Sequence, residues 1–350
     1  MKTWKRIAAL FLSVILALSL TTVSVRTFAA ERKAAGACGA EGSALTWTLD
    51  ADGTLTVAGS GEMEEYSEYT QVPWYEWRHD VRRIVVGEGV TSIGAYAFRD
   101  CAYAESVKLP EGLRRIGSCA FLNCALLRSV VIPEGTEVIG TYAFMYCDSL
   151  GAVSFPSTLR RIEHYAFDRC IGLTALTIPE GVVSIGKFAF YHSYSLRAVA
   201  FPASLNLVDE FAFSWCSGLT DVYYAGGETE WAQMQRTEGN FILDGADIRF
   251  RCGGNTPWGL VTDPGTGESV SWFLDKASGA VRLDGAVWPD LPLIAALYED
   301  SGRMLSARLL SWPETVDLSG AASAGIFWLD AGSGTPKAEC VIIDPVPERT

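Results

Sequence analysis

Histidine is scarce in this sequence, and the usual catalytic and cofactor signatures are missing. Only three histidines, His79, His164 and His192, occur among the 350 residues. A catalytic base needs an oriented partner and a nucleophile within reach, and nothing in their spacing supplies either, so we interpret them as surface residues. The sequence also has no CxxC pair, no glycine-rich loop that opens a helix and no G-x-S-x-G element. We therefore predict no metal, no cofactor and no catalytic residue.

Basic residues are also few. The chain carries 28 Lys and Arg against 41 Asp and Glu, a formal net charge of -13. A protein that binds nucleic acid needs a basic surface to neutralise phosphates, and an anionic membrane attracts basic segments. The charge therefore argues against nucleic acid and against a membrane surface as partners.

A long apolar run occurs once, near the start. Lys2, Lys5 and Arg6 precede the mostly apolar residues 7–20, which are too short to span a bilayer comfortably as a helix. Small and polar residues follow, so residues 1–30 are predicted to be a secretory signal peptide that is cleaved near Ala29 or Ala30. An uncleaved membrane anchor, or lipidation at Cys38, stays open as an alternative. After cleavage we expect no membrane span and a secreted or cell-surface location.

Internal repetition governs the middle of the chain. Six phenylalanines, each preceded by alanine, recur every 23 residues: Phe98, Phe121, Phe144, Phe167, Phe190 and Phe213. Cysteine follows three residues after five of them, and Ser193 is the exception. A fixed period of this length is typical of a solenoid, in which each unit buries its apolar face against the next.

Each repeat contains two short extended pieces. Alternating apolar residues such as Val130 and Ile132 predict a strand, and a proline such as Pro133 follows directly. A second extended piece ends at a repeated isoleucine, for example Ile139. The fold class predicted from this pattern is a β-rich leucine-rich-repeat solenoid of six coils with 23-residue repeats, closed by caps and followed by a small all-β sandwich domain.

These residues are similar to the BspA-like leucine-rich repeat family, whose repeat reads approximately I-G-x-x-A-F-x-x-C-x-x-L-x-x-V-x-I-P. The resemblance covers about residues 78–225. The residues before it, including Cys38-Gly39 and Gly59-Ser60-Gly61, resemble the segment often found ahead of such arrays. The resemblance implies a secreted or surface-displayed bacterial protein used in adhesion and protein binding, and it implies no catalytic residues.

Both ends of the array are predicted to be capped, because open solenoid ends are exposed edges. Residues 31–77 are predicted to form a β-hairpin cap around the turn at residues 50–53, with Trp74 and Trp77 as apolar bulk. The solenoid spans residues 78–225, and residues 226–252 form a second cap with a short helix that presents Trp231 and Met234. Residues 253–350 are predicted to be a linker and an immunoglobulin-like β-sandwich.

Nine cysteines in an exported chain raise the question of disulfides. Five occupy one repeat position, where a small apolar residue is needed, so we expect buried free thiols there, although bridges between adjacent coils stay open. No pairing can be read for the other four, Cys38, Cys119, Cys252 and Cys340.

The ligand would contact the variable positions of the repeat. Those just after the phenylalanines include a possible aromatic patch toward the later coils, made of Tyr146, Tyr191, His192, Tyr194 and Trp215. Exposed aromatic side chains are enriched at binding hot spots, although they also pack on neighbouring turns. We hypothesise a non-enzymatic exported binding or adhesion protein with an extracellular protein ligand. The alternative is a carbohydrate-binding or carbohydrate-processing cell-surface protein, because the chain contains eleven tryptophans.

Overall fold

The computed structural model describes residues 32–250 and, beyond them, only the strands between residues 258 and 343. The predicted signal peptide of residues 1–30 lies outside the described residues. In the part of the chain that is described, no helix is long and apolar enough to cross a membrane.

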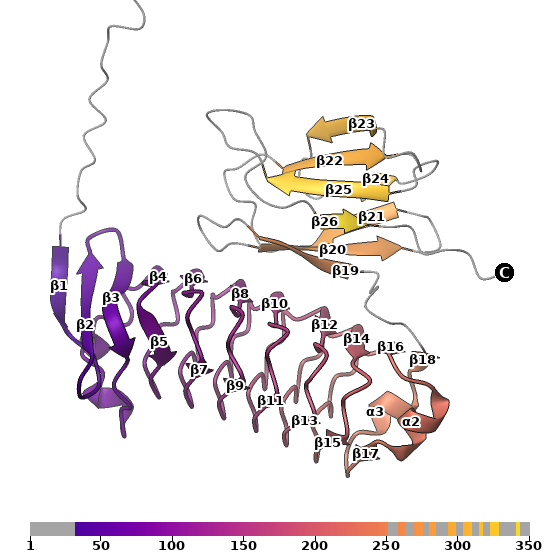
Figure 1. Cartoon of the computed structure of the whole chain (residues 1–350), viewed down its shortest axis with the longest axis horizontal. Coiled ribbons are helices and arrows are strands. Elements are labelled where there is room, and N and C mark those ends of the chain that lie inside the picture. Colours follow the sequence, from indigo (N-terminus) through magenta and orange to yellow (C-terminus); the bar gives the residue numbers. More distant parts are fainter. Residues whose placement is uncertain are drawn as a thin grey trace, which may run out of the picture. The chain divides into compact units, whose positions relative to one another are not determined.

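The described chain begins with an antiparallel sheet of three strands, β1 (Arg32–Ala37), β2 (Ala44–Asp50) and β3 (Thr54–Glu62). β2 pairs with β3 across the predicted turn, and alternate residues of both strands are buried. β3 then pairs in parallel with β4 and β5, the first two strands of the solenoid. The hairpin therefore covers the open front edge of the solenoid and joins it to the same hydrogen-bonded ladder (Figure 1).

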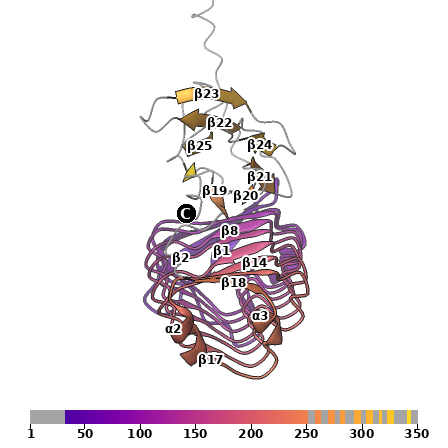
Figure 2. The ribbon, with the colours of Figure 1, turned by 90° about the vertical axis from the view of Figure 1, so that its right-hand side faces the viewer.

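Two rows of short parallel strands run along the solenoid (Figures 1 and 2). The first row consists of β4 (Arg83–Val86), β6 (Ser106–Lys108), β8 (Ser129–Val131), β10 (Ala152–Ser154), β12 (Ala175–Thr177), β14 (Ala198–Phe201), β16 (Asp221–Tyr224) and β18 (Asp247–Phe250). The second row consists of β5 (Val90–Ile93), β7 (Arg115–Ile116), β9 (Val138–Ile139), β11 (Arg161–Ile162), β13 (Ser184–Ile185), β15 (Leu207–Val208) and β17 (Gln235–Arg236). Two short 3-10 helices, at Tyr69–Gln71 and Tyr75–Trp77, precede the rows.

A tight turn that carries the Ala-Phe pair closes each coil. Its backbone is bonded to the next coil, since the Phe144 amide donates to the Ala166 carbonyl at 2.7 Å and the equivalent bond from Phe121 to Ala143 is also 2.7 Å. In residues 32–250, twelve non-glycine residues have positive φ, and they occur two before and two after each repeat phenylalanine. This left-handed conformation is rare for residues with a side chain, and here it bends the chain on both flanks of the buried phenylalanine.

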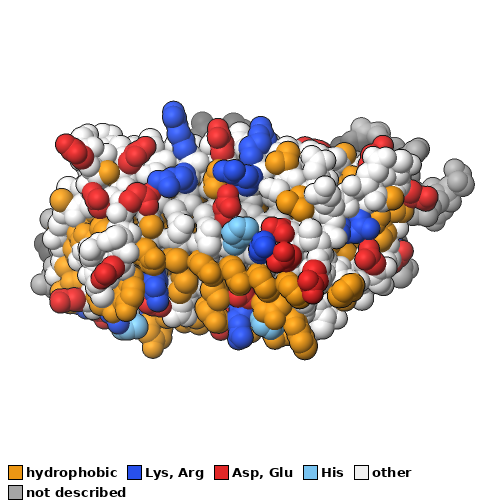
Figure 3. All heavy atoms as spheres, turned by 90° about the horizontal axis from the view of Figure 1, so that it is seen from below, with side chains coloured by type: hydrophobic (Ala, Val, Ile, Leu, Met, Phe, Trp, Pro, Cys, Tyr) orange, Lys and Arg blue, Asp and Glu red, His pale blue; other side chains and the backbone are white. Residues whose placement is uncertain are grey.

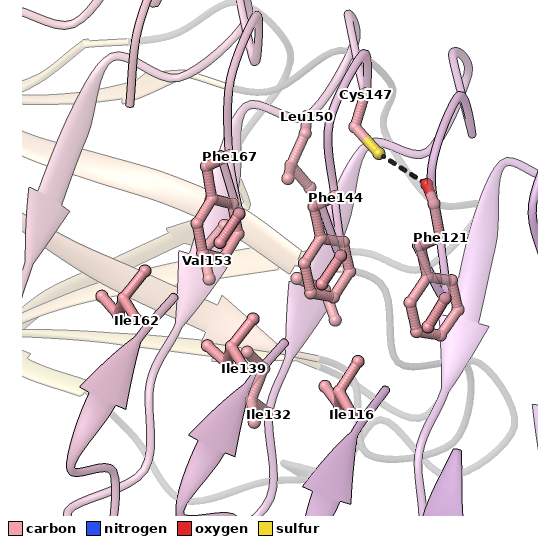
Figure 4. Packing of buried hydrophobic residues seen from close by; sticks show 14 of the residues in the cluster. Ile116, Phe121, Ile132, Ile139, Phe144, Cys147, Leu150, Val153, Ile162 and Phe167 are labelled. Carbon is pink, nitrogen blue, oxygen red and sulfur yellow. Dashed lines mark hydrogen bonds between the residues drawn. The ribbon is translucent and has the colours of Figure 1, made fainter. Parts of the chain in front are cut away.

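The core is a set of columns that run through all the coils. The six repeat phenylalanines are fully buried, and their rings stack with centroids 5.0 to 5.4 Å apart. Columns of leucine, isoleucine and valine lie beside them, as Figure 4 shows around Phe144, Leu150 and Ile139. The residues that the 23-residue period predicts to point inward are therefore the residues that pack, which confirms the predicted solenoid.

The repeat cysteines form hydrogen bonds to the preceding coil in addition to packing in the core. The Cys147 thiol donates to the Phe121 carbonyl at 3.3 Å, and Cys124, Cys170 and Cys216 make the equivalent bond at 3.1 to 3.2 Å (Figure 4). Burial raises the pKa of Cys101 and of Cys216 to about 12, so these thiols stay protonated. The seven cysteines in residues 32–250 are free and buried: Cys38, Cys101, Cys119, Cys124, Cys147, Cys170 and Cys216. Cys252 and Cys340 lie outside the described side chains.

Side chains complete the ladder at both ends of the solenoid. At the front, Trp74 stacks on Phe98, and its indole N–H donates to the Ala97 carbonyl at 2.7 Å. At the back, the Asn240 side-chain oxygen accepts from the Phe213 amide at 3.1 Å. Two short helices, α2 (Glu228–Gln233) and α3 (Phe241–Asp244), cover this end, and Trp231 is buried there as predicted.

The strands described beyond the solenoid form two four-stranded antiparallel sheets. They are β19 (Trp258–Thr262), β20 (Ser269–Asp275), β21 (Ala280–Asp284), β22 (Leu293–Tyr298), β23 (Met304–Leu309), β24 (Thr315–Asp317), β25 (Ser323–Trp328) and β26 (Val341–Ile343). The all-β character predicted for this region is therefore observed in its strands.

Candidate functional site

The candidate site lies on the turns that follow the repeat phenylalanines in the third to sixth coils. Tyr146, His192 and Trp215 occupy the same position in their repeats, two residues after the phenylalanine, and all three have a φ close to 60°. Because successive coils stack, the turn conformation presents these side chains in one row on the outside of the solenoid. The site is thus positioned by backbone hydrogen bonds between coils rather than by a flexible loop.

His192 is the centre of an aromatic group. Its ring centroid lies 3.8 Å from that of Tyr191, 5.5 Å from that of Tyr194 and 6.1 Å from that of Trp215. Trp215 is 60% exposed and Tyr194 is 44% exposed, so the group presents a large aromatic surface to solvent. Four of the five residues in the predicted patch are therefore brought together.

Tyr146 lies apart from this group. The Arg169 guanidinium sits over its ring, 5.3 Å from the centroid, in the coil between Tyr146 and His192. A cation over an aromatic face is attracted by the ring quadrupole. Arg169 therefore occupies the space between the two parts of the patch, so the patch is partly cationic.

A buried polar pair lies beneath the aromatic group, and the sequence analysis did not single it out. The Nδ1 atom of His192 is 3.8 Å from the Oδ1 atom of Asp168, and neither atom has a hydrogen-bond partner. The Asp168 side chain is 5% exposed and that of His192 is 16% exposed. The interpretation of all three histidines as surface residues is therefore wrong for His192, because its aromatic neighbours and Asp168 bury most of its side chain. His79 and His164 are exposed.

Burial shifts both groups toward their neutral forms. It raises the pKa of Asp168 from 3.8 to about 6, and Arg169 only partly opposes the change. Burial, and then the Arg169 charge, lowers the pKa of His192 below 6.5. Since folding favours the protonated Asp168, this group's contribution to stability falls as pH rises from about 4 to about 6 and stays low above that range. His192 acts in the opposite sense, because stability is lost as pH falls below 6.5.

We expect the substitution Asp168→Asn to stabilise the protein at pH 7.5. It removes a buried charge that has no hydrogen-bond partner on Oδ1, and the pKa shift corresponds to a gain of about 1 to 3 kcal/mol. The gain should shrink toward pH 4.5, where wild-type Asp168 is itself protonated. Urea unfolding at the two pH values measures both effects. Glu137→Gln, at an exposed site, is the control and should change stability by less than about 0.5 kcal/mol. A destabilised Asp168→Asn protein at pH 7.5 would contradict this account.

A second aromatic column adjoins the patch and was missed in the sequence. Tyr142, Tyr165, Phe188 and Phe211 each lie two residues before a repeat phenylalanine, and they are partly exposed. Their rings stack with centroids 4.7 to 5.1 Å apart and with planes 8° to 20° from parallel. The sequence does contain a signal for this column, because four successive repeats carry an aromatic residue two positions before the phenylalanine. The predicted patch, however, used only positions that follow the phenylalanine.

This face of the solenoid carries a continuous band of hydrophobic side chains along its length, with most charged side chains to one side of the band (Figure 3). Tyr191 links the aromatic patch to the second aromatic column, because its ring meets that of Phe188 edge to face with centroids 5.2 Å apart. Within the described residues, no group of three or more His, Cys, Asp and Glu is placed to hold a metal ion. What this face offers chemically is apolar and aromatic contact.

A β-solenoid of stacked 23-residue coils with buried leucine, isoleucine and phenylalanine columns is a leucine-rich repeat structure. Residues 74–159 and 137–231 match the family described as BspA type leucine rich repeat region, in six copies. The solenoid of this chain therefore belongs to that family. No curated protein matches the sequence.

Several solved structures are similar to parts of the chain. A leucine-rich repeat protein from Eubacterium ventriosum is 18% identical, with 55% of this chain and 72% of that chain covered and a TM-score of 0.30. A leucine-rich repeat protein of T. pallidum is 21% identical, with 54% and 71% covered and a TM-score of 0.31. The pneumococcal vaccine antigen PcpA is 21% identical, with 49% and 50% covered and a TM-score of 0.37.

Proposed function

We propose that this protein is a non-enzymatic binding or adhesion protein, secreted or displayed at a bacterial cell surface, that binds an extracellular protein ligand. Export is supported by the charged and apolar pattern of residues 1–30. Binding is supported by the family to which the solenoid belongs. The observation that carries the proposal is the exposed aromatic group of Tyr191, His192, Tyr194 and Trp215 on a rigid turn face.

Aromatic side chains exposed on a rigid scaffold suit a protein ligand, because they bury a large area while losing few rotatable bonds. Trp215 has most of its surface available, although backbone hydrogen bonds fix its turn, such as the bond from the His192 amide to the Ser214 carbonyl. The backbone that carries this patch does not have to be ordered on binding, so little conformational entropy is lost there.

A glycan ligand is the second candidate, and the exposed ring of Trp215 favours it. Sugars stack their C–H groups on the negative face of an aromatic ring. The column of Tyr142, Tyr165, Phe188 and Phe211 suits this contact less well, because its rings stack on one another and cover most of their faces. The glycan proposal therefore rests on Trp215 and Tyr194, whereas a protein ligand could use the whole face.

Protein and glycan arrays probed with residues 31–350 test the proposal. We expect retention of a protein ligand, and we expect Trp215→Ala to weaken it by about tenfold or more. Tyr69→Ala is the matched control, because Tyr69 is 37% exposed but lies at the front of the solenoid, where Arg99 of the first coil sits over its ring. Tight glycan binding without any protein ligand would overturn the proposal in favour of a carbohydrate-binding protein. Polysaccharide turnover that is lost on a single Asp or Glu replacement would establish an enzyme instead.

A further inference from the structure

Two buried polar atoms face each other beneath the aromatic group, and among the described residues neither has a hydrogen-bond partner. They are the Nδ1 atom of His192 and the Oδ1 atom of Asp168, and their separation of 3.8 Å is too long for a hydrogen bond. A buried polar atom without a partner costs free energy, so such atoms are usually paired. The two side chains, which we call the acid–imidazole pair, therefore lack one hydrogen bond that a small movement would supply.

The size of this movement follows from the distance. A charge-assisted hydrogen bond between nitrogen and oxygen is about 2.7 to 2.9 Å long, so the pair must close by about 1 Å. The backbone on both sides of the pair is fixed, because the Arg169 amide donates to the Tyr191 carbonyl at 2.8 Å and the His192 amide donates to the Ser214 carbonyl at 3.1 Å. Side-chain rotation therefore has to supply the movement.

The imidazole ring is the part of the pair that is free to rotate. The Asp168 side chain is 5% exposed and is enclosed on all sides, whereas that of His192 is 16% exposed. The ring of His192 also lies beside Tyr194 and Trp215, which are themselves exposed and can give way. Closure of the pair therefore moves His192 toward Asp168.

The proton content of the pair decides whether it closes. One proton taken from solvent converts a carboxylate and a neutral imidazole into a carboxylate and an imidazolium, or into a carboxylic acid and an imidazole. Either form places one donor opposite one acceptor, so Nδ1 and Oδ1 then share a hydrogen bond. Burial supports the uptake, since it raises the pKa of Asp168 to about 6. The separation of 3.8 Å corresponds to the pair without this proton.

Other charged and titratable groups surround the pair from three coils. They are Asp148 in the third coil, Tyr165, Arg169 and Cys170 in the fourth, and Lys187, Tyr191 and Tyr194 in the fifth. The Arg169 charge opposes protonation of His192, and Lys187 is paired with Glu210. Burial raises the pKa of Tyr165 and of Cys170, so both stay protonated around pH 6. The sixth coil presents Trp215 to the pair, and this side chain does not titrate.

Closure of the pair changes the aromatic group above it. The ring centroid of His192 lies 6.1 Å from that of Trp215. Asp168 belongs to the fourth coil and Trp215 to the sixth, with His192 between them, so a ring that moves toward Asp168 moves away from Trp215. The side chain that is most available to a ligand therefore loses part of its contact with His192 when the pair takes up a proton.

We propose that Asp168 and His192 form a proton-operated switch, in which acidification joins the two side chains and rearranges the aromatic group above them. The rearrangement is a property of the free protein, whereas its effect on binding rests on the proposed function. A ligand over Trp215 and Tyr194 buries the pair further, and burial disfavours the carboxylate. Binding is therefore accompanied by proton uptake, and the affinity rises as pH falls from 7.5 to 5.5.

The pH dependence of the Trp215 indole N–H resonance in residues 31–350 tests the switch. Trp215→Phe assigns this resonance, and His192→Gln assigns the ring resonances of His192. We expect both sets of resonances to shift together, with one common midpoint between about pH 5 and pH 7. His192→Gln should abolish the Trp215 shift. Asp168→Asn should lower its midpoint by about one pH unit or more, because no carboxylate then stabilises the imidazolium.

His79→Gln is the matched control, because His79 is exposed and precedes the first strand of the solenoid. It should leave the Trp215 transition unchanged. A Trp215 resonance that does not move with pH would overturn the proposal. The same holds for a shift that persists in His192→Gln, or for a midpoint that Asp168→Asn leaves in place.

Protein arrays probed at pH 7.5 and at pH 5.5 test the effect on binding. We expect the wild-type protein to bind a retained ligand about three- to tenfold more tightly at pH 5.5, and Asp168→Asn to bind it about equally at both pH values. If a ligand that requires Trp215 binds both proteins with the same pH dependence, the switch does not act on binding and the proposed function stands. If no protein ligand is retained at either pH, the proposed function fails, and the Trp215 resonance alone decides whether the switch exists.

Discussion

Replacing Phe144 with alanine is expected to lower the free energy of unfolding by about 3 to 5 kcal/mol. The ring is fully buried and stacks between Phe121 at 5.0 Å and Phe167 at 5.1 Å, so its removal leaves a cavity in the middle of the column. Each coil of a solenoid is stabilised mainly by its two neighbours, so the loss falls on both interfaces of the third coil. Urea unfolding of residues 31–350 measures the change.

The control for this prediction is in the same coil. Tyr146→Ala removes a ring of similar size only two residues away, but that ring is 37% exposed and lies outside the column. It should cost less than Phe144→Ala, about 1 to 2 kcal/mol, because over a third of the Tyr146 surface is already exposed in the folded protein and no core cavity is left. An unchanged unfolding midpoint in Phe144→Ala would mean that the inward register of the phenylalanines is misassigned.

The second large effect on stability is expected at the front cap, when the buried Trp74 is replaced. We expect Trp74→Ala to cost about 3 to 5 kcal/mol, because Trp74 is 1% exposed, stacks on Phe98 at 5.6 Å and meets Trp47 edge to face at 5.6 Å. The substitution also leaves the Ala97 carbonyl without the indole donor. Amide hydrogen exchange should show the loss of protection first in the coils nearest the cap, since solenoids unfold from a weakened end.

Trp74→Phe separates the two contributions of the indole. It keeps an aromatic ring in the stack with Phe98 but cannot donate to Ala97, so it should cost about 1 to 3 kcal/mol. If Trp74→Phe and Trp74→Ala were equally destabilising, ring stacking would contribute nothing at the cap. If neither changed stability, the front end would not depend on Trp74.

The repeat and its inward residues were predictable from the sequence because one period governs both the chain and the packing. Phe144 and Leu150 recur in register, so their burial follows from stacking alone. Trp74 was recognised as apolar bulk, but its hydrogen bond was not, because the direction of an indole N–H depends on the tertiary structure around it. The role of Asn240 could not be predicted from the sequence. Its side-chain oxygen accepts a hydrogen bond from Phe213 only at the end of the array, so the residue does not recur in the repeats.

The candidate site was less predictable for a related reason. Positions after the phenylalanine could be identified as variable, but neither the left-handed turns nor the burial of His192 over Asp168 could be read from residue types. The sequence predicts only that a small residue fills the repeat position of Cys170 and Ser193, and it does not predict a hydrogen bond there. In the structure the Cys170 thiol reaches the carbonyl of Phe144, whereas the shorter Ser193 hydroxyl has no hydrogen-bond partner.

Hydroxyl-radical footprinting with the protein ligand selected on arrays tests most directly whether the turn face is the binding surface. This measurement reports side-chain accessibility, and the candidate patch contains Tyr194 and Trp215, while Tyr69 is exposed at the front end, where Arg99 of the first coil lies over its ring. We predict that the ligand protects Tyr194 and Trp215 from oxidation and leaves Tyr69 unchanged. Protection of Tyr69 without protection of Tyr194 and Trp215 would contradict the account.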